Sequence, residues 1–447
     1  MLYDGAGCLI VQTYGNAGNE PIELEGPPIL NYQPIQSAFA PAVPQSYEEL
    51  GIQQTIVLDL MLRRMLMEGF SNLQRLSNCL KLSMPVIDTC FRHMRQQQLV
   101  EVKGMIGNDY QFTLSQAGKQ MASERFQVNQ YAGPAPVSLK DYHAATQAQA
   151  ARVDIDHHIL KSNFSDLVVS DQLLDQLGPA LISQSSIFIY GPSGNGKTSI
   201  AERMLRVYQD GIRIPYAIEV DGQIISLYDP VVHTPIEVEE DPDIDPRWIL
   251  CRRPCIVVGG ELIPSMLELR LDDSSGLYAA PMQLKANNGI FIIDDFGRQL
   301  MSPRDLLNRW IVPLDRKIDY LTLRYGVKFQ VPFELMVVFS TNLEPSDLAD
   351  EAFLRRIHNK IYVEAVDANS FDQIFQRVMQ GRRLQTDHDS SEYLRQLCLR
   401  EGRTELRACY PSDIANIIMS IGKYEGQPPV ITKSNLERAA NLYFAKG

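Results

Sequence analysis

The feature that most constrains the fold of this chain is the segment GPSGNGKTS at 191–199. It directly follows SSIFIY, a run that is apolar after its two serines and is typical of a buried parallel strand. It leads into SIAERMLRVYQ, which has the composition of a helix. Strand, Gly-rich loop and helix in this order match G-x-x-x-x-G-K-[ST], which predicts a phosphate-binding loop (P-loop). The structural alternative is a Gly-rich turn without a ligand.

Each residue type in this loop has a physical role. Glycines let the backbone turn so that several N–H groups point at one anion, and the N-terminus of the following helix adds its positive end. Lys197 is expected to place its charge on the β- and γ-phosphates, and Thr198 to offer its hydroxyl to Mg²⁺. The predicted nucleotide-binding residues of the loop are Gly191, Pro192, Ser193, Gly194, Asn195, Gly196, Lys197, Thr198 and Ser199.

A second apolar run, GIFIIDDFG at 289–297, ends in two acidic residues. A P-loop ATPase holds Mg²⁺ with a carboxylate at the end of a neighbouring strand, so Asp294 is the predicted metal ligand together with Thr198. Asp295 is expected to polarise the attacking water. The letters DFG also occur in protein kinases, but this sequence has no H-R-D, and a P-loop replaces the kinase glycine loop. The expected cofactors are therefore ATP and Mg²⁺.

With these motifs in place, residues 155–447 resemble the AAA+ ATPases. FSDLVVSDQLLDQLGPAL at 164–181 is similar to the segment that precedes the P-loop in that family. ELMVVFSTNLEP at 334–345 is similar to its sensor-1 strand, with Asn342 as the polar residue. The resemblance implies that Asn342 lies between the acidic strand and the γ-phosphate.

The same resemblance assigns roles to arginines. DLADEAFLRRIHNKI resembles the segment that ends in an arginine finger, with Arg356 preferred and Arg355 as the alternative. In the family this finger reaches the nucleotide of the neighbouring subunit, which implies self-association in a ring, taken here as hexameric. GRTELRACYPSDIANII resembles the sensor-2 region, with Arg407 preferred and Arg403 as the alternative.

Two features depart from the family pattern. The family usually has Asp-Glu where this chain has Asp294 and Asp295, and the shorter second side chain suggests slow hydrolysis or a need for tightening by a partner. The chain between the P-loop and the acidic strand is also longer than a minimal AAA+ core needs. Its excess includes 217–233, which we expect to form a hairpin, and 259–289, which resembles the helix-2-insert branch that contains the MoxR-like ATPases.

Upstream of this region, three helical patterns and a hairpin pattern follow one another and resemble a winged helix domain. The expected fold is α/β, a parallel-sheet P-loop AAA+ core with a C-terminal helical lid, preceded by an α+β winged helix domain. Four helices are expected in the lid, at 368–380, 389–400, 411–422 and 432–445. The predicted domains are a flexible Pro-rich arm at 1–46, the winged helix at 47–125, a linker at 126–154, the ATPase core at 155–365 and the lid at 366–447.

The front domain leaves its partner open. The third helix of a winged helix lies in the DNA major groove in many proteins, and here it carries Arg92, Arg95 and several glutamines that can read base edges. The domain is only mildly basic, however, and winged helices also dock proteins. DNA binding and protein docking therefore both remain as predictions.

Composition limits the remaining possibilities. The 447 residues suggest two or three domains, and a net charge of −12 disfavours general affinity for nucleic acid. The 7 scattered cysteines are typical of free thiols in a reducing cytoplasm, which is the expected location. The first residues lack a basic region, and no apolar run approaches the ~18 residues of a membrane span, so we expect neither a signal peptide nor a membrane span.

The predicted function is that of an ATP-hydrolysing AAA+ protein that forms a ring and remodels an unknown protein client or assembly. Two alternatives remain. The first is a DNA-bound regulator or loader in which ATP controls assembly. The second is a switch that binds ATP but hydrolyses little of it.

Overall fold

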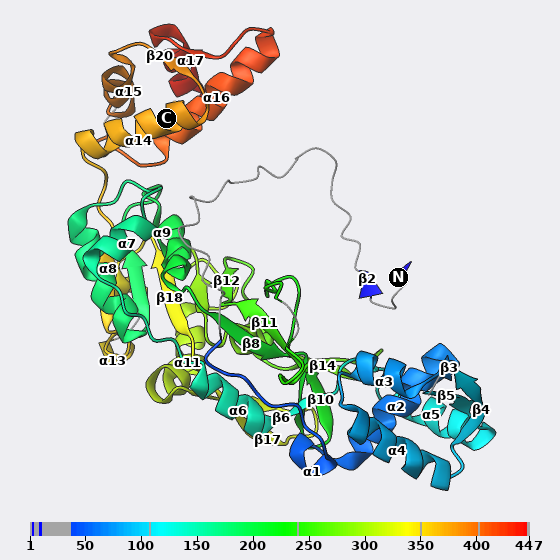
Figure 1. Ribbon diagram of the computed structural model, residues 1–447. Helices are drawn as coiled ribbons and strands as arrows, with labels where there is room; N and C mark the ends of the chain where they lie inside the picture. Colours follow the sequence, from blue (N-terminus) through cyan, green and yellow to red (C-terminus); the bar gives the residue numbers. More distant parts are fainter. Residues whose placement is uncertain are drawn as a thin grey trace. The chain divides into compact units, whose positions relative to one another are not determined.

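The computed structural model describes residues 2–3, 9–10, 37–106, 109–238, 241–348, 351–400 and 403–444. The chain separates into one unit at Met1–Ile35 and another at Gln36–Gly447. In the first unit, β1 (Leu2–Tyr3) pairs with β2 (Leu9–Ile10). Most of the arm predicted at 1–46 lies outside the described residues. The second unit contains all the other described helices and strands (Figure 1).

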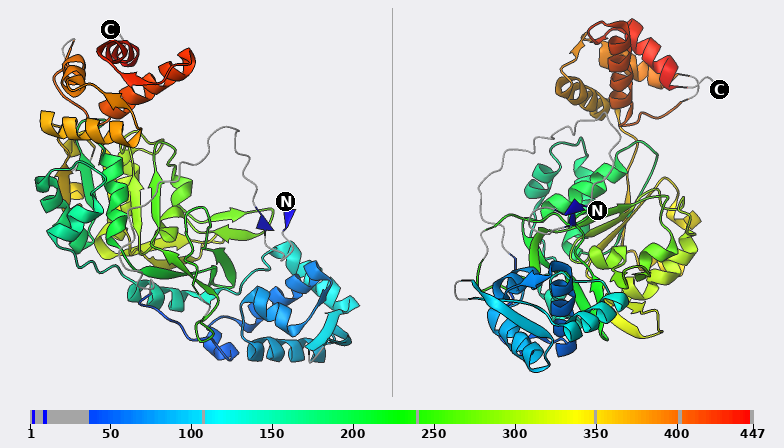
Figure 2. Two further views of the ribbon diagram at one scale, coloured as in Figure 1. Left: turned by 45° about the horizontal axis from the view of Figure 1, so that its top comes forward. Right: turned by 90° about the vertical axis from the view of Figure 1, so that its right-hand side faces the viewer.

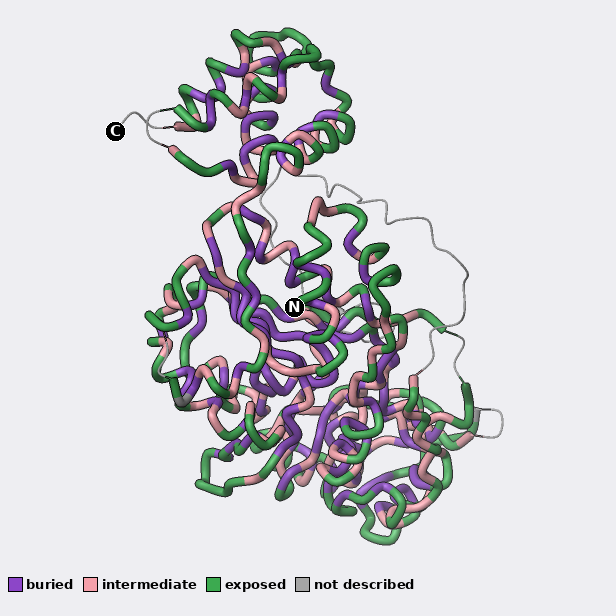
Figure 3. Tube along the Cα trace, turned by 90° about the vertical axis from the view of Figure 1, so that its left-hand side faces the viewer, coloured by how far each residue is buried: buried purple, intermediate pink, exposed green. Residues whose placement is uncertain are grey.

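Its centre is a five-stranded parallel sheet. The spatial order is β12 (Cys255–Val258), β15 (Ile290–Ile293), β18 (Met336–Thr341), β7 (Ile187–Tyr190) and β19 (Asn359–Tyr362). Alternate side chains point to opposite faces, so Ile187 and Ile189 enter one apolar core while Phe188 enters another. Because both faces are covered, β7, β12 and β15 are continuously apolar and β18 begins with an apolar run, whereas the edge strand β19 (NKIY) does not. Figure 3 shows buried positions in each part of the second unit, and the central strands β7, β15 and β18 are almost wholly buried.

Helices cover both faces of the sheet. The first face carries α7 (His157–Asn163), α8 (Asp171–Ser183), α9 (Lys197–Arg203) and the short 3-10 helix η1 (Met204–Val207). The second face carries η2 (Pro264–Leu267), α10 (Met282–Lys285), α11 (Pro303–Arg316), α12 (Pro345–Leu348) and α13 (Glu351–Leu354). The expected α/β fold with a parallel-sheet P-loop core is therefore confirmed.

A second β-rich layer accounts for the extra residues before the acidic strand. A five-stranded sheet has the order β13 (Arg270–Asp272), β14 (Leu277–Ala279), β10 (Gln223–Ser226), β9 (Ala217–Val220) and β6 (Val137–Ser138). The antiparallel pair β9–β10 confirms the hairpin predicted within 217–233. One face of this sheet contributes to an apolar core. Further residues of that core come from α6 (Leu139–Ala148), from the pair β8 (Gly211–Pro215) and β11 (Trp248–Arg252), and from the hairpin β16 (Ile318–Thr322) and β17 (Lys328–Pro332).

Residues 126–154, predicted as a linker between domains, form secondary structure and pack into an apolar core. They contain β6 and α6, and Val137 and Tyr142 are buried in the apolar core of the β-rich layer. The polar and alanine-rich sequence conceals this because only a few apolar positions face the core. The sheet that buries them is built by residues far ahead in the chain.

The last ten residues of the predicted arm, 37–46, are likewise packed and not free. Ser37 Oγ donates a hydrogen bond to Gln149 Oε1 at 2.9 Å. The ring of Phe39 packs edge-on against Trp248, with ring centroids 5.1 Å apart. These contacts are long-range, so the Pro-rich composition of the segment gave no indication of them.

The front domain combines helices with a three-stranded antiparallel sheet of order β3-β5-β4. The three helical segments and the hairpin predicted here are present, with a further helix before them and another after them. The elements are α1 (Tyr47–Leu50), α2 (Gln54–Glu68), β3 (Phe70–Ser71), α3 (Leu73–Leu80), α4 (Met84–Gln96), β4 (Val100–Ile106), β5 (Asp109–Leu114) and α5 (Gln116–Val128).

The C-terminal segment is helical, as predicted. Four helices pack around their own apolar core, visible in orange to red in Figure 2. They are α14 (Ala368–Gly381), α15 (Ser390–Cys398), α16 (Tyr410–Glu425) and α17 (Lys433–Tyr443), with a short parallel pair β20 (Gln385–Thr386) and β21 (Val430–Ile431).

Among the described residues, no helix combines the length and the apolar character that a membrane-spanning helix requires.

Candidate functional site

The predicted phosphate-binding loop connects β7 to α9 at the carboxyl end of the parallel sheet. Gly191, Gly194 and Gly196 all have positive φ angles, of 137°, 83° and 79°. At Gly191 a Cβ atom would lie 2.3 Å from the carbonyl oxygen of Val363, the residue that follows β19. Glycine is therefore required there both by the backbone conformation and by the close approach of a neighbouring chain segment.

Lys197 is buried at the start of α9, with only 9% of its surface exposed. Its Nζ donates hydrogen bonds to the carbonyl oxygens of Gly191 at 2.9 Å and Pro192 at 3.0 Å. Burial lowers the pKa of Lys197, while the nearby carboxylates of Asp294 and Asp295 act in the opposite direction. The ammonium thus faces the inside of the loop, where a phosphate would compete with the two carbonyls for it.

A direct contact joins the loop to the acidic strand. Thr198 Oγ1 donates a hydrogen bond to Asp294 Oδ2 at 2.8 Å, across 96 positions of sequence. Asp294 follows β15, whose carboxyl end lies at the same edge of the sheet as the loop. The two predicted metal-binding residues therefore lie together, with a hydroxyl and a carboxylate side by side.

Asp295, the residue predicted to polarise the attacking water, is exposed and has a left-handed backbone with a φ of 47°. The turn is held in place around it. Gln299 Nε2 donates to the carbonyl oxygen of Asp294 at 2.9 Å, and the Arg298 amide donates to the carbonyl of Asp295 at 3.0 Å. Aspartate is among the few non-glycine residues that occupy the left-handed region readily, so the shorter acid suits this backbone.

Strand β18, which precedes Asn342, lies between β15 and β7. The half-buried Asn342 therefore follows a strand that runs between the acidic strand and the strand before the P-loop. This strand is tied to the acidic turn, because Thr341 Oγ1 donates to the carbonyl oxygen of Phe296 at 2.7 Å and the Phe296 amide donates to that of Ser340 at 2.7 Å.

The two sensor-2 candidates occupy different environments. Arg407 lies against the P-loop, since a Cβ on Gly194 would be 3.4 Å from its Cδ. Arg403 Nε instead donates to the carbonyl oxygen of Cys398, the last residue of α15, at 2.9 Å, and its guanidinium lies 3.9 Å from the ring centroid of Phe444. These contacts give Arg403 a helix-capping role, and the choice between Arg407 and Arg403 as sensor 2 stays a prediction.

The two arginine-finger candidates follow α13. Arg355 is exposed and Arg356 is half-buried. Their backbone amides donate to the carbonyl oxygens of Glu351 at 3.1 Å and Phe353 at 2.8 Å, which extends α13 by a turn. The exposure of Arg355 leaves its guanidinium accessible from outside this chain.

A cavity of about 290 Å³ adjoins the P-loop, and sequence reasoning did not identify most of its lining. Asn195 and Ile200 contribute from the loop and α9, and Ala408 contributes from the segment before α16. The rest comes from 168–176, which includes the start of α8, and from 362–370, which follows β19. No local pattern marks these residues, because they come together only when the chain folds.

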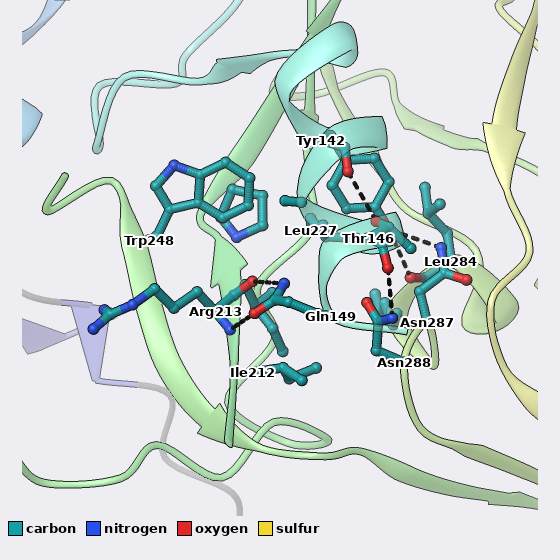
Figure 4. Close-up of a pocket in the computed structure, with 14 residues that line it drawn as sticks. Tyr142, Thr146, Gln149, Ile212, Arg213, Leu227, Trp248, Leu284, Asn287 and Asn288 are labelled. Atoms are coloured by element: carbon teal, nitrogen blue, oxygen red, sulfur yellow. Dashed lines mark hydrogen bonds between the residues drawn. The ribbon is translucent and has the colours of Figure 1, made fainter. Parts of the chain in front are cut away.

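A second, much smaller cavity of about 20 Å³ lies in the β-rich layer (Figure 4). Three of its polar side chains are hydrogen-bonded: Gln149 to the amide and carbonyl of Arg213, Asn287 to Tyr142, and Asn288 to the carbonyl of Thr146, while Arg213 Nε is buried without a hydrogen-bond partner. It has room for about one water molecule, so its role is structural.

The cysteines of the described residues, Cys79, Cys90, Cys251, Cys255, Cys398 and Cys409, carry free thiols. Within the described ranges no group of three or more His, Cys, Asp and Glu side chains is placed to hold a metal ion. Two of these cysteines, Cys251 and Cys255, lie in the segment CRRPC at 251–255. Arg253 of this segment is buried, and its guanidinium is paired with Asp210 at 2.6 Å.

Comparison with known proteins gives a local family match and distant structural similarity. Residues 367–442, which include all of α14, α15 and α16 and most of α17, match a family described as a domain of unknown function (DUF8689). No curated protein matches the chain.

Among solved structures, NtrX from Brucella abortus in complex with ATP is 14% identical, with a TM-score of 0.39 over 62% of this chain and 56% of that chain. Its complex with ADP is 15% identical, with a TM-score of 0.40 over 64% and 58%. The RuvB Holliday junction branch migration motor of Thermotoga maritima is 12% identical, with a TM-score of 0.34 over 61% and 67%. Similarity at this level carries no argument about function, and the chain spans little more than half of the NtrX chains.

Proposed function

We propose that this chain binds ATP together with Mg²⁺ and hydrolyses it as a member of the AAA+ ATPases. The observation that carries the proposal is the hydrogen bond between Thr198 and Asp294, which joins the P-loop to the acidic strand. The shared edge of the sheet, with β18 between the other two strands, supports the same interpretation. Hydroxyl and carboxylate oxygens are the ligands that Mg²⁺ prefers, and it is commonly held by one or two carboxylates plus substrate phosphates.

In this proposal the protein acts by positioning and by electrostatics. The loop amides and Lys197 bind the phosphates, and Thr198 and Asp294 hold the metal. Mg²⁺, when bound, neutralises charge that develops on the phosphates. Asp295 accepts a proton from the attacking water, and Asn342 orients that water from the end of β18. The cavity beside Asn195 receives the base, and Arg407 approaches the phosphates from the C-terminal helical segment.

We further propose that the active form is a ring, with Arg356 or Arg355 supplied by the neighbouring subunit. The exposure of Arg355 supports a role outside its own chain, whereas Arg356 is half-buried and is proposed from the sequence resemblance. Hydrolysis would then drive remodelling of a protein client, with the C-terminal segment acting as the lid. We propose that the β-rich layer corresponds to the insertion expected from the sequence. We also propose that the protein acts in the cytoplasm, where cysteines such as those of the described residues remain free thiols.

Nucleotide binding tests the core of the proposal. The wild-type chain should bind ATP with Mg²⁺ in calorimetric titration, and Lys197→Ala should abolish binding while leaving the thermal unfolding midpoint nearly unchanged. Light scattering with and without ATP tests ring formation. Equal ATP affinity in the wild type and in Lys197→Ala would disprove a nucleotide site at this loop.

The front domain is better suited to protein than to DNA. Six of its nine Lys and Arg side chains lie in ion pairs within the domain, which neutralises charge that DNA phosphates would need. Those six are Arg63, Arg64, Arg75, Arg92, Lys103 and Arg125. On the hairpin, Met105 is 60% exposed and Tyr110, stacked on Phe91, is 40% exposed. We therefore propose winged helix docking of a protein and keep the DNA-bound regulator as the second candidate.

Duplex binding at low salt separates these two candidates. If the domain docks protein, the full chain should show no salt-dependent shift in the anisotropy of a labelled duplex. Binding that disappears with rising salt and in the Arg92→Ala, Arg95→Ala double variant would favour the regulator instead.

A switch with little hydrolysis is distinguished by turnover. ATP binding without measurable phosphate release, in the assembled state and at saturating Mg²⁺, would favour it over the ATPase. The switch remains a candidate function because the Asp295 side chain, the proposed base, is exposed.

A further inference from the structure

Two hydrogen bonds join the outer turn of the P-loop to the segment before α16. The amide of Ala408 donates to Asn195 Oδ1 at 3.2 Å, and the amide of Cys409 donates to the carbonyl oxygen of Gly194 at 2.9 Å. The contact is also close-packed, since a Cβ on Gly194 would lie 2.7 Å from Cys409 Sγ. Two consecutive loop residues thus contact two consecutive residues of the helical segment.

Asn195 is the side chain that makes this junction. It is only 6% exposed, although it belongs to a loop at the edge of the sheet. While its Oδ1 accepts from Ala408, its Nδ2 donates to the carbonyl oxygen of Pro192 at 3.4 Å. Lys197 Nζ donates to that same carbonyl at 3.0 Å. A single amide side chain therefore links the helical segment to the carbonyl that also contacts the phosphate-binding lysine.

We propose that Asn195 is a positioning residue that couples the conformation of the P-loop to the position of the C-terminal helical segment. This inference rests on the proposed nucleotide site and adds a regulatory link to it. When a phosphate draws Lys197 away from Pro192, Asn195 remains to hold that carbonyl and the Ala408 amide. Movement of the helical segment in turn removes the partners of Gly194 and Asn195. The coupling is reciprocal. If the position of the helical segment changes the affinity of the P-loop for phosphate, then phosphate binding changes the preferred position of the helical segment by the same free energy.

The chain offers a matched variant on each side of the hydrogen bond. Asn195→Ala removes the acceptor. Ala408→Pro removes the donor, and Ala408 sits at the second position of a turn in which the Tyr410 amide donates to the carbonyl of Arg407 at 3.2 Å. Proline is favoured at that turn position, so the backbone is expected to keep its course. Ser420→Ala, on the exposed side of α16, is the control.

The experiment measures ATP affinity of the full chain by calorimetry and hydrogen exchange of the 403–413 peptide with and without ATP. Each single variant should weaken ATP binding about fivefold, the effect of one hydrogen bond, and should reduce the ATP-dependent protection of the peptide. The double variant should be no weaker than either single variant, because both remove the same interaction. Ser420→Ala should match the wild type in both measurements.

The outcomes separate this inference from the proposed function. Wild-type affinity and protection in Asn195→Ala, or a double variant weakened by the product of the single effects, would overturn the coupling while leaving the nucleotide site intact. A wild-type chain that binds no ATP would overturn both. Thermal unfolding midpoints of all variants report whether Ala408→Pro has merely unfolded the helical segment, in which case Asn195→Ala decides.

Discussion

At the scale of single residues, the site depends on a charged amine that is kept out of water. Lys197 combines burial with two carbonyl contacts and two nearby carboxylates. Asp295 combines exposure with an unusual backbone conformation. Each feature gives a prediction that a generic P-loop would not.

The first prediction concerns pH. Burial lowers the pKa of Lys197 below the ordinary value of 10.5, so the folded chain releases this proton before the unfolded chain does. The contribution of Lys197 to the free energy of unfolding is therefore greatest above pH 10.5, where the amine is neutral in both states. This contribution is lost as the pH falls through the lowered pKa of the folded chain. ATP requires the ammonium, so its affinity should decline as pH rises through the same window. Titrations from neutral pH to about pH 10 test this, with Lys197→Arg as a control because arginine stays charged. Parallel declines in both proteins would contradict it.

The second prediction concerns Asp295. Asp295→Asn keeps a residue that tolerates the left-handed backbone, so ATP binding should persist while turnover falls by about a hundredfold or more. Asp295→Glu restores the usual family residue but strains this backbone, so turnover should not rise above that of the wild type. Steady-state phosphate release and calorimetric affinity measure the two effects. Equal turnover in the wild type and Asp295→Asn would exclude Asp295 as the base.

The third prediction separates Arg403 from Arg407. Arg403→Ala removes a cap from α15 and a ring contact, so the helical segment should lose about 1 kcal/mol of stability while ATP affinity stays close to that of the wild type. Arg407→Ala should do the reverse and weaken ATP binding with little change in stability. Chemical denaturation followed by calorimetry compares the two variants. Reversed outcomes would transfer the sensor-2 role to Arg403.

At the scale of elements, the hydrophobic periodicity of the sequence predicted those helices and strands whose own residues form the apolar face that they bury. The four C-terminal helices begin and end within a few residues of the predicted ranges, because each buries one apolar stripe in its own core. Strands β7, β15 and β18 were recognisable as continuous apolar runs. Strand β6 and helix α6 were missed, because their core is supplied by β9, β10 and other distant strands.

The fourth prediction is that a glycine-to-alanine substitution within a helix destabilises the protein, whereas helix propensity alone would predict stabilisation. Gly118 lies in the first turn of α5, and alanine is normally the better helix former. A Cβ there would lie 2.0 Å from the carbonyl oxygen of Leu99, so Gly118→Ala should destabilise the front domain by roughly 1–3 kcal/mol. Gly381, at the end of α14, is the matched control, because a Cβ added there would meet no atom within 4 Å. Thermal unfolding that leaves Gly118→Ala as stable as Gly381→Ala would refute the clash.

At the scale of the whole molecule, the proposed site is incomplete within one chain. The fifth prediction is that Arg356→Ala and Asp295→Asn proteins are each nearly inactive alone but regain turnover when mixed. A mixed ring contains interfaces in which an intact Asp295 faces an intact Arg356. Phosphate release as a function of mixing ratio measures this, and light scattering verifies that the assemblies form. Mixed assemblies without recovered turnover would argue against an arginine supplied in trans.

The sequence by itself determined the strand, Gly-rich loop and helix at 187–203, the other apolar strands and the C-terminal helices, because each is encoded by residues close together in the chain. Only the tertiary structure decided that Thr198 meets Asp294, that Arg407 lies against the loop, and that Asn195 contacts Ala408. It also decided that 126–154 packs into an apolar core. Such pairings depend on strand order and on surfaces assembled from distant segments, and no local pattern of residues records which surfaces will meet.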